Sequence, residues 1–386
     1  MRRLNWAWLA VIMAGCGMIY SGNLLLPASQ ETEPTALNLT SAAMLDGSQD
    51  EPDPGSLPAP AGRSGEWLMV SNHVHSTFSS DAKQSLAQLI ERARVAGLNS
   101  LILTDHNTMQ GADTPEFKQA PLVMVKGIEW GARRDHGERV VGHAGLIELA
   151  GNAPLPTNVS IDQMVDLALR RKGFIIANHP FLRGISWAAT DLHPAVGAIE
   201  VWNSWWALVD PLTRNNRAKD WWEHYLATGR RVTALGGSDS HGHVYDSPTR
   251  PVNLVFATKR TAGAILEAIS AGRVTVEATT RAARIMLEAD PQNAGSWSVM
   301  QGEELTVAKA GPVPVRARIK GGKDLTVEFY GKSGLLKAYR VASDDATIRF
   351  EMPVQPGDGD YVRAELKARP NHWWSLTALT NPIYLR

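Results

Sequence analysis

The residues most able to do chemistry are histidines and carboxylates that recur in short groups along the chain. The first group is Asn72-His73-Val74-His75, with Asp81 a short loop later, and the second is Thr104-Asp105-His106-Asn107. Histidines at positions i and i+2 of a strand point to the same side, so we expect His73 and His75 to converge on one point. Neutral imidazole is the commonest metal ligand in proteins, and Asp81 would add a hard carboxylate. The pattern indicates a metal site.

Further groups of the same kind follow downstream, and together they define one candidate ligand set. Its members are His73, His75, Asp81, His106, Glu129, His143, His179, Asp239 and His241. Six of the chain's 11 histidines belong to it. The one cysteine, Cys16, excludes an internal disulfide and any site built on several thiolates. The ligands must therefore be His, Asp and Glu.

The size of this set predicts more than one ion. A catalytic zinc takes about three protein ligands, so nine candidates predict two or three divalent ions with bridging carboxylates. Nitrogen and oxygen donors without sulfur suit Zn, Mn or Fe and do not choose among them. Such a centre makes a hydroxide from bound water and clamps the oxygens of an in-line displacement, which suits phosphoester hydrolysis. It would also suit carboxylic esters or carbamates.

Three residues receive catalytic assignments: Asp105, His179 and Asp239. For Asp105 two roles stay open, because a carboxylate beside a ligand either orients an imidazole or touches a metal. Glu200 and Asn203 end a predicted strand and would either meet substrate or make structural hydrogen bonds. Three arginines could pair with an anionic substrate: Arg133, Arg134 and Arg183. For each of them a solvated surface position is favoured. Five tryptophans could line an apolar pocket, but we expect them to pack in the core: Trp202, Trp205, Trp206, Trp221 and Trp222.

The elements that must position these groups are short apolar strands, each of which follows an amphipathic helix. Leu86, Leu89, Ile90 and Ala93 have helical spacing, Gly97 ends that helix, and the strand 100–103 then delivers Asp105-His106. A further helix is predicted to end at Gly173. Alternating helices and strands predict a parallel sheet, and in a closed α/β barrel the carboxyl ends of the strands gather at one mouth.

Beyond about residue 281 the apolar period changes to two, as in Val313, Val315, Ala317 and Ile319. This alternation and the turn residues between the runs predict an antiparallel β-sandwich. We therefore expect a signal segment at 1–26, a disordered tether at 27–64, a metallohydrolase barrel at 65–280 and a β-sandwich domain at 281–386.

The N-terminus has the features of an export signal, because Arg2 and Arg3 precede a mostly apolar run. Met13-Ala14-Gly15-Cys16 resembles a lipoprotein signal in which Cys16 is lipidated. An uncleaved membrane anchor is the alternative, since residues 17–26 continue fairly apolar. We expect an exported protein of the periplasm or cell envelope, tethered to the lipid bilayer. The formal net charge of zero provides no overall field for nucleic acid, and no protein partner is evident.

These motifs together resemble the PHP (polymerase and histidinol phosphatase) superfamily, over roughly Leu68 to Thr279. The resemblance implies a distorted (β/α)7 barrel with a trinuclear site, followed here by the small antiparallel β-sandwich. Asp81 stands where some members have histidine. The stretch from Asp239 to Arg273 and the ending Thr380-Asn381-Pro382-Ile383-Tyr384 are similar to the carbaryl-hydrolase-like metallohydrolase branch.

The resemblance and the ligand set predict a metal-dependent hydrolase of a small-molecule ester, with a phosphoester as the first choice. Hydrolysis of a carbamate or carboxylic ester at the same centre is the alternative. A non-catalytic binding module with a structural metal site is a rival from another class. Several ions argue against that rival, because structural sites are usually coordinatively closed.

Overall fold

The computed structural model describes residues 52–131, 142–151, 153–157, 159–187, 191–204, 214–243, 246–357, 359–369 and 375–386. The predicted signal, Cys16, most of the predicted tether, Arg133, Arg134, Trp205 and Trp206 lie outside these residues. Within the described part of the chain, no helix is long and apolar enough to cross a membrane.

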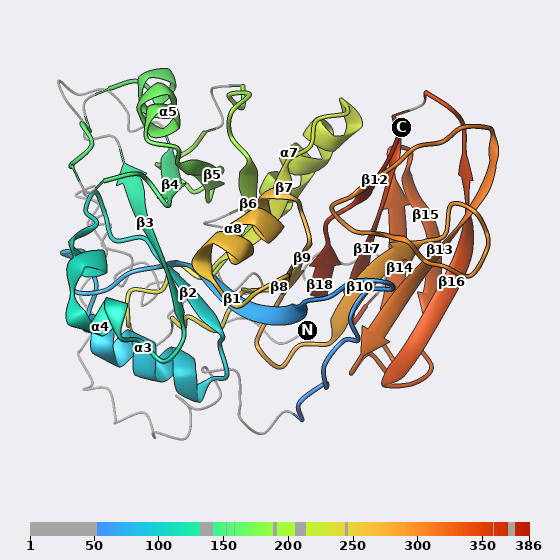
Figure 1. Cartoon of the computed structure of the whole chain (residues 1–386), viewed down its shortest axis with the longest axis horizontal. Coiled ribbons are helices and arrows are strands. Elements are labelled where there is room, and N and C mark those ends of the chain that lie inside the picture. Colours follow the sequence, from blue (N-terminus) through green and yellow to red (C-terminus); the bar gives the residue numbers. More distant parts are fainter. Residues whose placement is uncertain are drawn as a thin grey trace, which may run out of the picture.

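The first part of the chain forms a strongly curled sheet with helices around it (Figure 1). Its strands are β1 (Glu66–Val74), β2 (Ser100–Leu103), β3 (Val123–Gly131), β4 (His143–Ile147), β5 (Phe174–Asn178), β6 (Ala198–Asn203), β7 (Thr233–Gly237), β8 (Val252–Ala257) and β9 (Val274–Glu277). Its helices are α3 (Leu86–Val95), η1 (Gln110–Asp113), α4 (Pro115–Lys118), α5 (Ile161–Arg170), α7 (Asn215–Ala227) and α8 (Ala262–Ser270).

Local sequence explains where these helices begin and end. Ser85 and Ser160 cap α3 and α5, and each forms a reciprocal capping box with a glutamine three residues later. Gly97 follows α3 with a φ of 80°, which glycine adopts without a steric penalty. The predicted end of α5 at Gly173 is close, but Lys172 takes the left-handed conformation there, with a φ of 57°.

Strand direction is mixed. β1, β2 and β3 are parallel, as are β5, β6 and β7, whereas β4 is antiparallel to both β3 and β5 and β8 is antiparallel to β1. The strict alternation of a (β/α)7 barrel therefore does not hold at β4. The prediction is confirmed at a coarser level, as a mixed α/β fold with a large curled half-barrel sheet.

The curl brings the ends of β1 and β7 together. Backbone bonds join Ser238 N to the Asn72 carbonyl (2.9 Å), Asp239 N to the His73 carbonyl (2.7 Å) and His75 N to the Ser240 carbonyl (2.9 Å). Inside the curl, each strand from β1 to β8 contributes a buried apolar residue, such as Val70, Ile102 and Val255. Ile265, Ala268 and Ile269 of α8 pack against this set.

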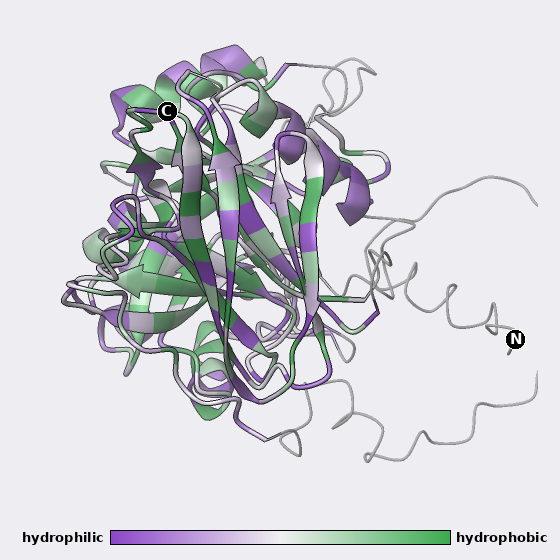
Figure 2. Ribbon diagram, turned by 90° about the vertical axis from the view of Figure 1, so that its right-hand side faces the viewer, coloured by the Kyte–Doolittle hydropathy of each residue, from purple (hydrophilic) through white to green (hydrophobic). Residues whose placement is uncertain are grey.

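The rest of the chain forms two layers whose strands pair antiparallel, except that β12 pairs with β19 in parallel (Figure 1). Its strands are β10 (Arg284–Ala289), β11 (Val299–Met300), β12 (Glu304–Leu305), β13 (Gly311–Lys320), β14 (Thr326–Gly331), β15 (Gly334–Arg340), β16 (Asp345–Val354), β17 (Tyr361–Lys367), β18 (Leu376–Thr380) and β19 (Ile383–Leu385). The order β11-β10-β13-β16 forms one sheet. Hydrophobic and hydrophilic bands alternate along these strands (Figure 2).

The second layer is not a separate sheet. β18 pairs with β9, with Ala378 opposite Glu277, so one sheet runs from β12 through β18 and β9 into β8 and β1. An apolar core with Val315, Phe329 and Ala364 lies between the two layers. The predicted strands are present, but the layer that contains β17 and β18 continues the curled sheet instead of closing an independent sandwich.

Candidate metal centre

All nine predicted ligands lie at one edge of the curled sheet. His73 and Glu129 end β1 and β3, His106 follows β2, His179 follows β5, and Asp239 with His241 follows β7. His143 reaches the same edge for a different reason. It begins β4, and because β4 runs antiparallel to β3 and β5, its first residue lies beside their ends, with His143 opposite both Gly131 and Asn178.

Glu129 occupies the middle of the cluster. Its Oε1 lies 3.0 Å from His73 Nε2, 3.0 Å from His143 Nδ1 and 3.0 Å from His179 Nε2. Its Oε2 lies 2.9 Å from His106 Nδ1 and 3.5 Å from His75 Nε2. A single buried carboxylate thus faces five imidazoles, which is the position of a bridging ligand.

The other two carboxylates lie nearer to solvent. Asp239 Oδ1 is 3.3 Å from His73 Nε2 and 3.4 Å from His75 Nε2. Asp81 Oδ2 is 3.3 Å from His106 Nε2 and 3.7 Å from His241 Nε2. The Asp81 side chain is 48% exposed, whereas that of Glu129 is 1% exposed. The cluster is therefore closed on the His73 side and open on the Asp81 side.

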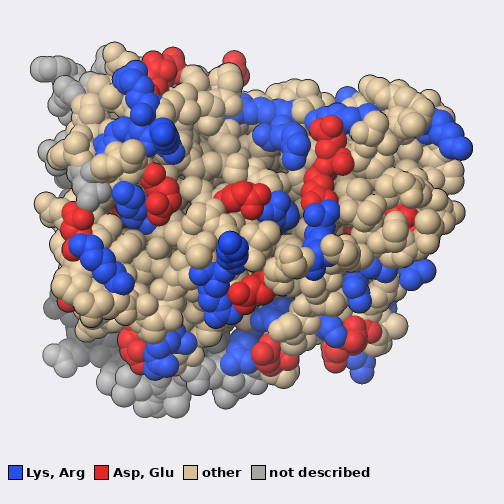
Figure 3. Space-filling view, viewed as in Figure 1, with Lys and Arg blue, Asp and Glu red and all other residues tan. Residues whose placement is uncertain are grey.

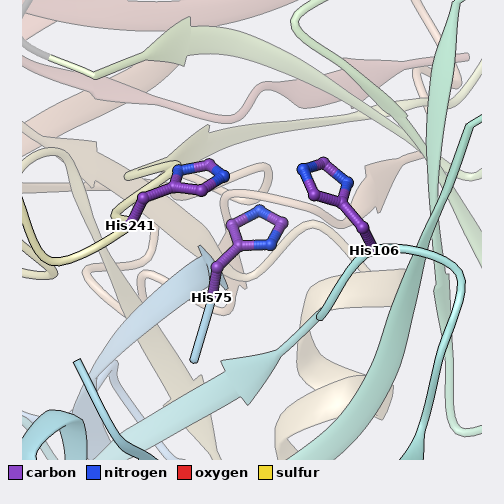
Figure 4. Close-up of side chains that lie close together, drawn as sticks. All are labelled: His75, His106 and His241. Atoms are coloured by element: carbon purple, nitrogen blue, oxygen red, sulfur yellow. The ribbon is translucent and has the colours of Figure 1, made fainter. Parts of the chain in front are cut away.

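Among the described residues, three groups of side chains are compact enough to hold an ion. They are His75, His106 and His241; His73, His75, Glu129 and Asp239; and His106, Glu129 and His143. In each group the donor atoms lie within 4.8 Å of one another. Figure 4 shows the first group, in which His75, His106 and His241 follow β1, β2 and β7 and their rings lie close together. The groups share His75, His106 and Glu129, so the centre is one continuous cluster.

Strained backbone marks three of the ligands. His73, His179 and Asp239 have φ values of 62°, 25° and 52°, in a region that residues with a Cβ rarely adopt. The pairing of β1 with β2 shifts register between Ser71 and Val74. The predicted strand alternation is therefore not what brings His73 and His75 together. They converge because β1 becomes irregular at His73, and their ring centroids lie 5.1 Å apart.

Asp105 does not face the centre of the cluster. Its Oδ1 accepts from Ser76 N (2.7 Å) and Ser79 Oγ (2.9 Å), and its Oδ2 accepts from Ser76 Oγ (2.9 Å). Because Ser79 Oγ donates to Asp105, it is free to accept from His75 Nδ1 at 3.1 Å. This relay places the ring proton of His75 on Nδ1 and turns the lone pair of Nε2 toward Glu129 and Asp239. Of the two roles left open, this geometry is that of orienting an imidazole.

The electrostatics of the cluster favour ionised carboxylates. Burial alone would raise the pKa of Glu129, but the charges of His73, His143 and His106 hold that pKa well below its usual value. Burial would also raise the pKa of Asp81, and His106 and His241 instead lower it to about 2. Burial lowers the pKa of His75 to about 3, so this ring is neutral at physiological pH. Burial would lower the pKa values of His73, His106 and His179, but Glu129 raises all three, so a cation would take the place of a proton on these rings.

Several inward-facing atoms fit a cation directly. His73 Nε2, His75 Nε2 and Glu129 Oε2 are buried and have no hydrogen-bond partner among the described residues. A buried polar atom without a partner costs free energy unless something else satisfies it. Here the unpaired atoms are all metal-ligating types, and they converge. The residues present therefore fit divalent ions.

Other predicted residues lie behind or away from the centre. Glu200 and Asn203 are 0% and 2% exposed, which places them behind the ligands and not on an open rim. Arg183 is exposed, and Trp202 and Trp222 belong to the core around α7. Ser79 and Asn178 contact candidate ligands and Asn72 contacts Glu200, although the sequence analysis gave these three residues no role. Both asparagines directly precede a ligating histidine, and that position is the signal that could have identified them.

Part of the chain that contains the candidate site matches a family model. Residues 71–170 match the family model described as "PHP domain". This segment contains the ligands from His73 to His143. No curated protein matches the chain.

Three solved structures are similar to the chain. One is a two-domain protein from Bacteroides vulgatus containing a predicted PHP-like metal-dependent phosphoesterase (17% identity, TM-score 0.47, covering 85% of this chain and 98% of that chain). A second is a candidate metal-dependent phosphoesterase from Bifidobacterium adolescentis (16% identity, TM-score 0.34, covering 47% of this chain and 89% of that chain). A third is an amidohydrolase from Chromobacterium violaceum with bound sulfate and no metal (15% identity, TM-score 0.31, covering 45% of this chain and 87% of that chain).

Proposed function

We propose that this chain is a metal-dependent hydrolase that acts on a phosphoester. The observation that carries the proposal is the convergence of six imidazoles and three carboxylates at one edge of the sheet, where Glu129 belongs to two of the three overlapping groups that could hold an ion. Two or three divalent ions, of Zn, Mn or Fe, would be held by these groups. The match of residues 71–170 to the PHP domain supports the same class.

The ions would supply Lewis-acid activation of water and of the substrate oxygen. The protein's own residues do the rest. Glu129 and Asp239 keep the imidazoles apart and supply negative charge, while His73, His75 and His179 are buried and fixed in orientation. Asp81, His106 and His241 form the exposed side of the centre, so substrate would approach there.

Charge favours a phosphoester over a neutral ester. The carboxylates of Asp81, Glu129, Asp239 and Glu200 carry four negative charges, whereas three divalent ions carry six positive ones. A centre loaded with three ions would therefore be net positive and would attract an anionic group. On the face shown in Figure 3, Lys and Arg are interspersed with Asp and Glu.

The test is a substrate panel on the full chain loaded with Zn, Mn or Fe. It contains p-nitrophenyl phosphate, bis-p-nitrophenyl phosphate and naphthyl carbamates. We expect metal-dependent turnover of a phosphate ester, which EDTA abolishes and which His179→Ala and Asp239→Ala remove. Turnover of the carbamate alone would instead favour the carbaryl-hydrolase-like branch, to which the stretch from Asp239 to Arg273 is similar. Metal-saturated protein that turns over none of these esters would favour the binding-module alternative.

We further propose that the protein is exported and held to a membrane by a lipid on Cys16. The support is the basic start and apolar run that precede Cys16. Palmitate labelling of cells that express the full chain tests this, with Cys16→Ser as the control. Label that persists in Cys16→Ser would reject lipidation at this residue.

A further inference from the structure

A buried carboxylate outside the ligand set lies directly behind the centre. Glu200 of β6 is 0% exposed and accepts from four groups. Its Oε1 lies 2.8 Å from His73 Nδ1 and 3.2 Å from Asn72 Nδ2. Its Oε2 lies 2.9 Å from His179 N and 3.3 Å from Asn203 Nδ2. One side chain therefore ties together β1, β6 and the end of β5.

Each branch of this network leads to a ligand. The contact with Nδ1 fixes the ring of His73. The contact with the backbone N–H of His179 holds that residue where its φ is 25°. The amide of Asn203 contacts both Glu200 and, at 3.5 Å, Asp239 Oδ2. Glu200 thus acts on His73, His179 and Asp239 without facing the ions itself.

The chemistry of the network requires an anion. A carboxylate only accepts, so His73 Nδ1 must carry a ring proton, and Nε2, on the side of Glu129 and Asp239, is then the ring nitrogen that is available to an ion. A glutamine at position 200 has one acceptor oxygen and one donor NH₂ group. In one orientation its NH₂ group would face the N–H of His179, so that two donors would meet. In the other orientation the NH₂ group would donate to His73 Nδ1, and the ring proton would move to Nε2.

The chain makes room for this residue. A Cβ on Gly237 would lie 2.0 Å from Glu200 Oε1 and 2.4 Å from its Cδ, so only glycine fits there. Asn203 is in turn held by α7, since Asn203 N donates to Asn215 Oδ1 (2.9 Å) and Asn215 Nδ2 donates to the Asn203 carbonyl (3.0 Å). We propose that Glu200 is a positioning residue of the metal centre, which sets the tautomer of His73 and the placement of His179 and Asp239.

This inference rests on the metal centre of the proposed function, and the experiment separates the two. Full-length protein is freed of metal and titrated with Co²⁺, whose visible absorption reports ligand number and geometry. Affinity is measured by competition with a chelator, and thermal unfolding is recorded with EDTA and with Co²⁺. The matched control is Glu277→Gln, because Glu277 is also a fully buried strand carboxylate and its charged neighbour is Arg284, not a ligand.

We expect Glu200→Gln to bind Co²⁺ about 10–100-fold more weakly and with an altered spectrum, and to lose much of the Co²⁺-induced rise in melting temperature. Glu277→Gln should bind like the wild type. Equal affinity and spectrum in Glu200→Gln would overturn the inference. Failure of the wild type to bind Co²⁺ would instead reject the metal centre and with it the proposed function.

A second variant covers the case in which Glu200→Gln does not fold in EDTA. Asn203→Ala leaves the carboxylate and the His73 contact in place but removes the link from Glu200 to Asp239. We expect weaker Co²⁺ binding with an unfolding temperature in EDTA close to that of the wild type. Unchanged Co²⁺ affinity in this variant would reject the proposed effect of Glu200 on Asp239.

Discussion

Glu129 Oε1 lies 3.0 Å from His179 Nε2, although 50 residues separate the two along the chain. The contact exists because β3 and β5 end at the same edge of the curled sheet, with the start of β4 between them. Since His73 and His143 contact the same oxygen, Glu129 is the residue that two of the three candidate ion groups share.

Replacing Glu129 should therefore remove a ligand from more than one ion. We expect wild-type protein to carry more than one equivalent of transition metal and Glu129→Gln to lose at least one equivalent, together with hydrolysis. Elemental analysis after gel filtration measures the metal content. Glu351→Gln, at an exposed position of β16, is the control and should keep the wild-type content. Full occupancy in Glu129→Gln would show that this carboxylate is not shared between ions.

Ser79→Ala should weaken metal binding although serine is not a ligand here. The substitution removes the hydroxyl that accepts from His75 Nδ1 and donates to Asp105, so the His75 ring loses its fixed orientation. We expect about 10–100-fold lower affinity in a chelator competition. The adjacent Ser80 is exposed, and Ser80→Ala should have no effect. Equal losses in both variants would contradict a specific role for Ser79.

Gly237→Ala should destabilise both the fold and the centre. The new methyl group would overlap the carboxylate of Glu200, and overpacking of this kind typically costs about 1–3 kcal/mol. Gly263→Ala is the matched control, because a Cβ there meets nothing within 4 Å and alanine favours the helix α8 by roughly 0.5–1 kcal/mol. Chemical unfolding in EDTA measures both changes. A neutral Gly237→Ala would mean that Glu200 can move aside freely.

Glu277 should make the protein less stable as the pH rises. Burial raises the pKa of Glu277 from 4.5 to about 8, against a smaller lowering by Arg284, and neither carboxylate oxygen has a hydrogen-bond partner among the described residues. Between these two values the folded state holds a proton that the unfolded state has released. Stability is therefore full below about pH 4.5 and falls by up to ~1.4 kcal/mol per pH unit as the pH rises toward 8.

Glu277→Gln removes this dependence. The variant should melt several degrees higher than the wild type at pH 8 and at nearly the same temperature at pH 4.5. Differential scanning calorimetry at both pH values in EDTA measures the difference. A constant difference between the two proteins at both pH values would show that Glu277 does not titrate in this range.

Much of the site could be predicted because ligands after short apolar strands leave a local signature. His106, Glu129 and His179 each follow such a strand, and topology then gathers them. Their mutual distances could not be predicted, since they depend on the antiparallel β4 and on backbone bonds between the ends of β1 and β7. The role of Glu200 was also beyond sequence reasoning, because an acidic residue near a strand end is compatible with solvent, substrate or burial, and only packing against Gly237 decides.

The continuity of the sheet through β9 and β18 was likewise not evident from the apolar pattern. The change of period near residue 281 correctly indicates antiparallel strands, but a two-residue repeat is the same in a separate sandwich and in an extension of an existing sheet. Which neighbour β18 selects depends on contacts that are distant in sequence, such as Asn381, whose side chain bonds to Ala234 and Val274.

The helix α7 connects two regions that the sequence suggested could be independent. Asn215 near its start braces Asn203 beside the ligands, while Lys219 and Glu223 on its next turns pair with Glu365 and Arg363 of β17. Arg363 and Glu365 are 1% and 0% exposed, so removal of either part would break buried ion pairs and leave their partners without a counter-charge. Excision of the C-terminal strands would therefore leave α7 without the side chains that hold it beside the candidate metal centre, and fusion or truncation designs should keep both halves.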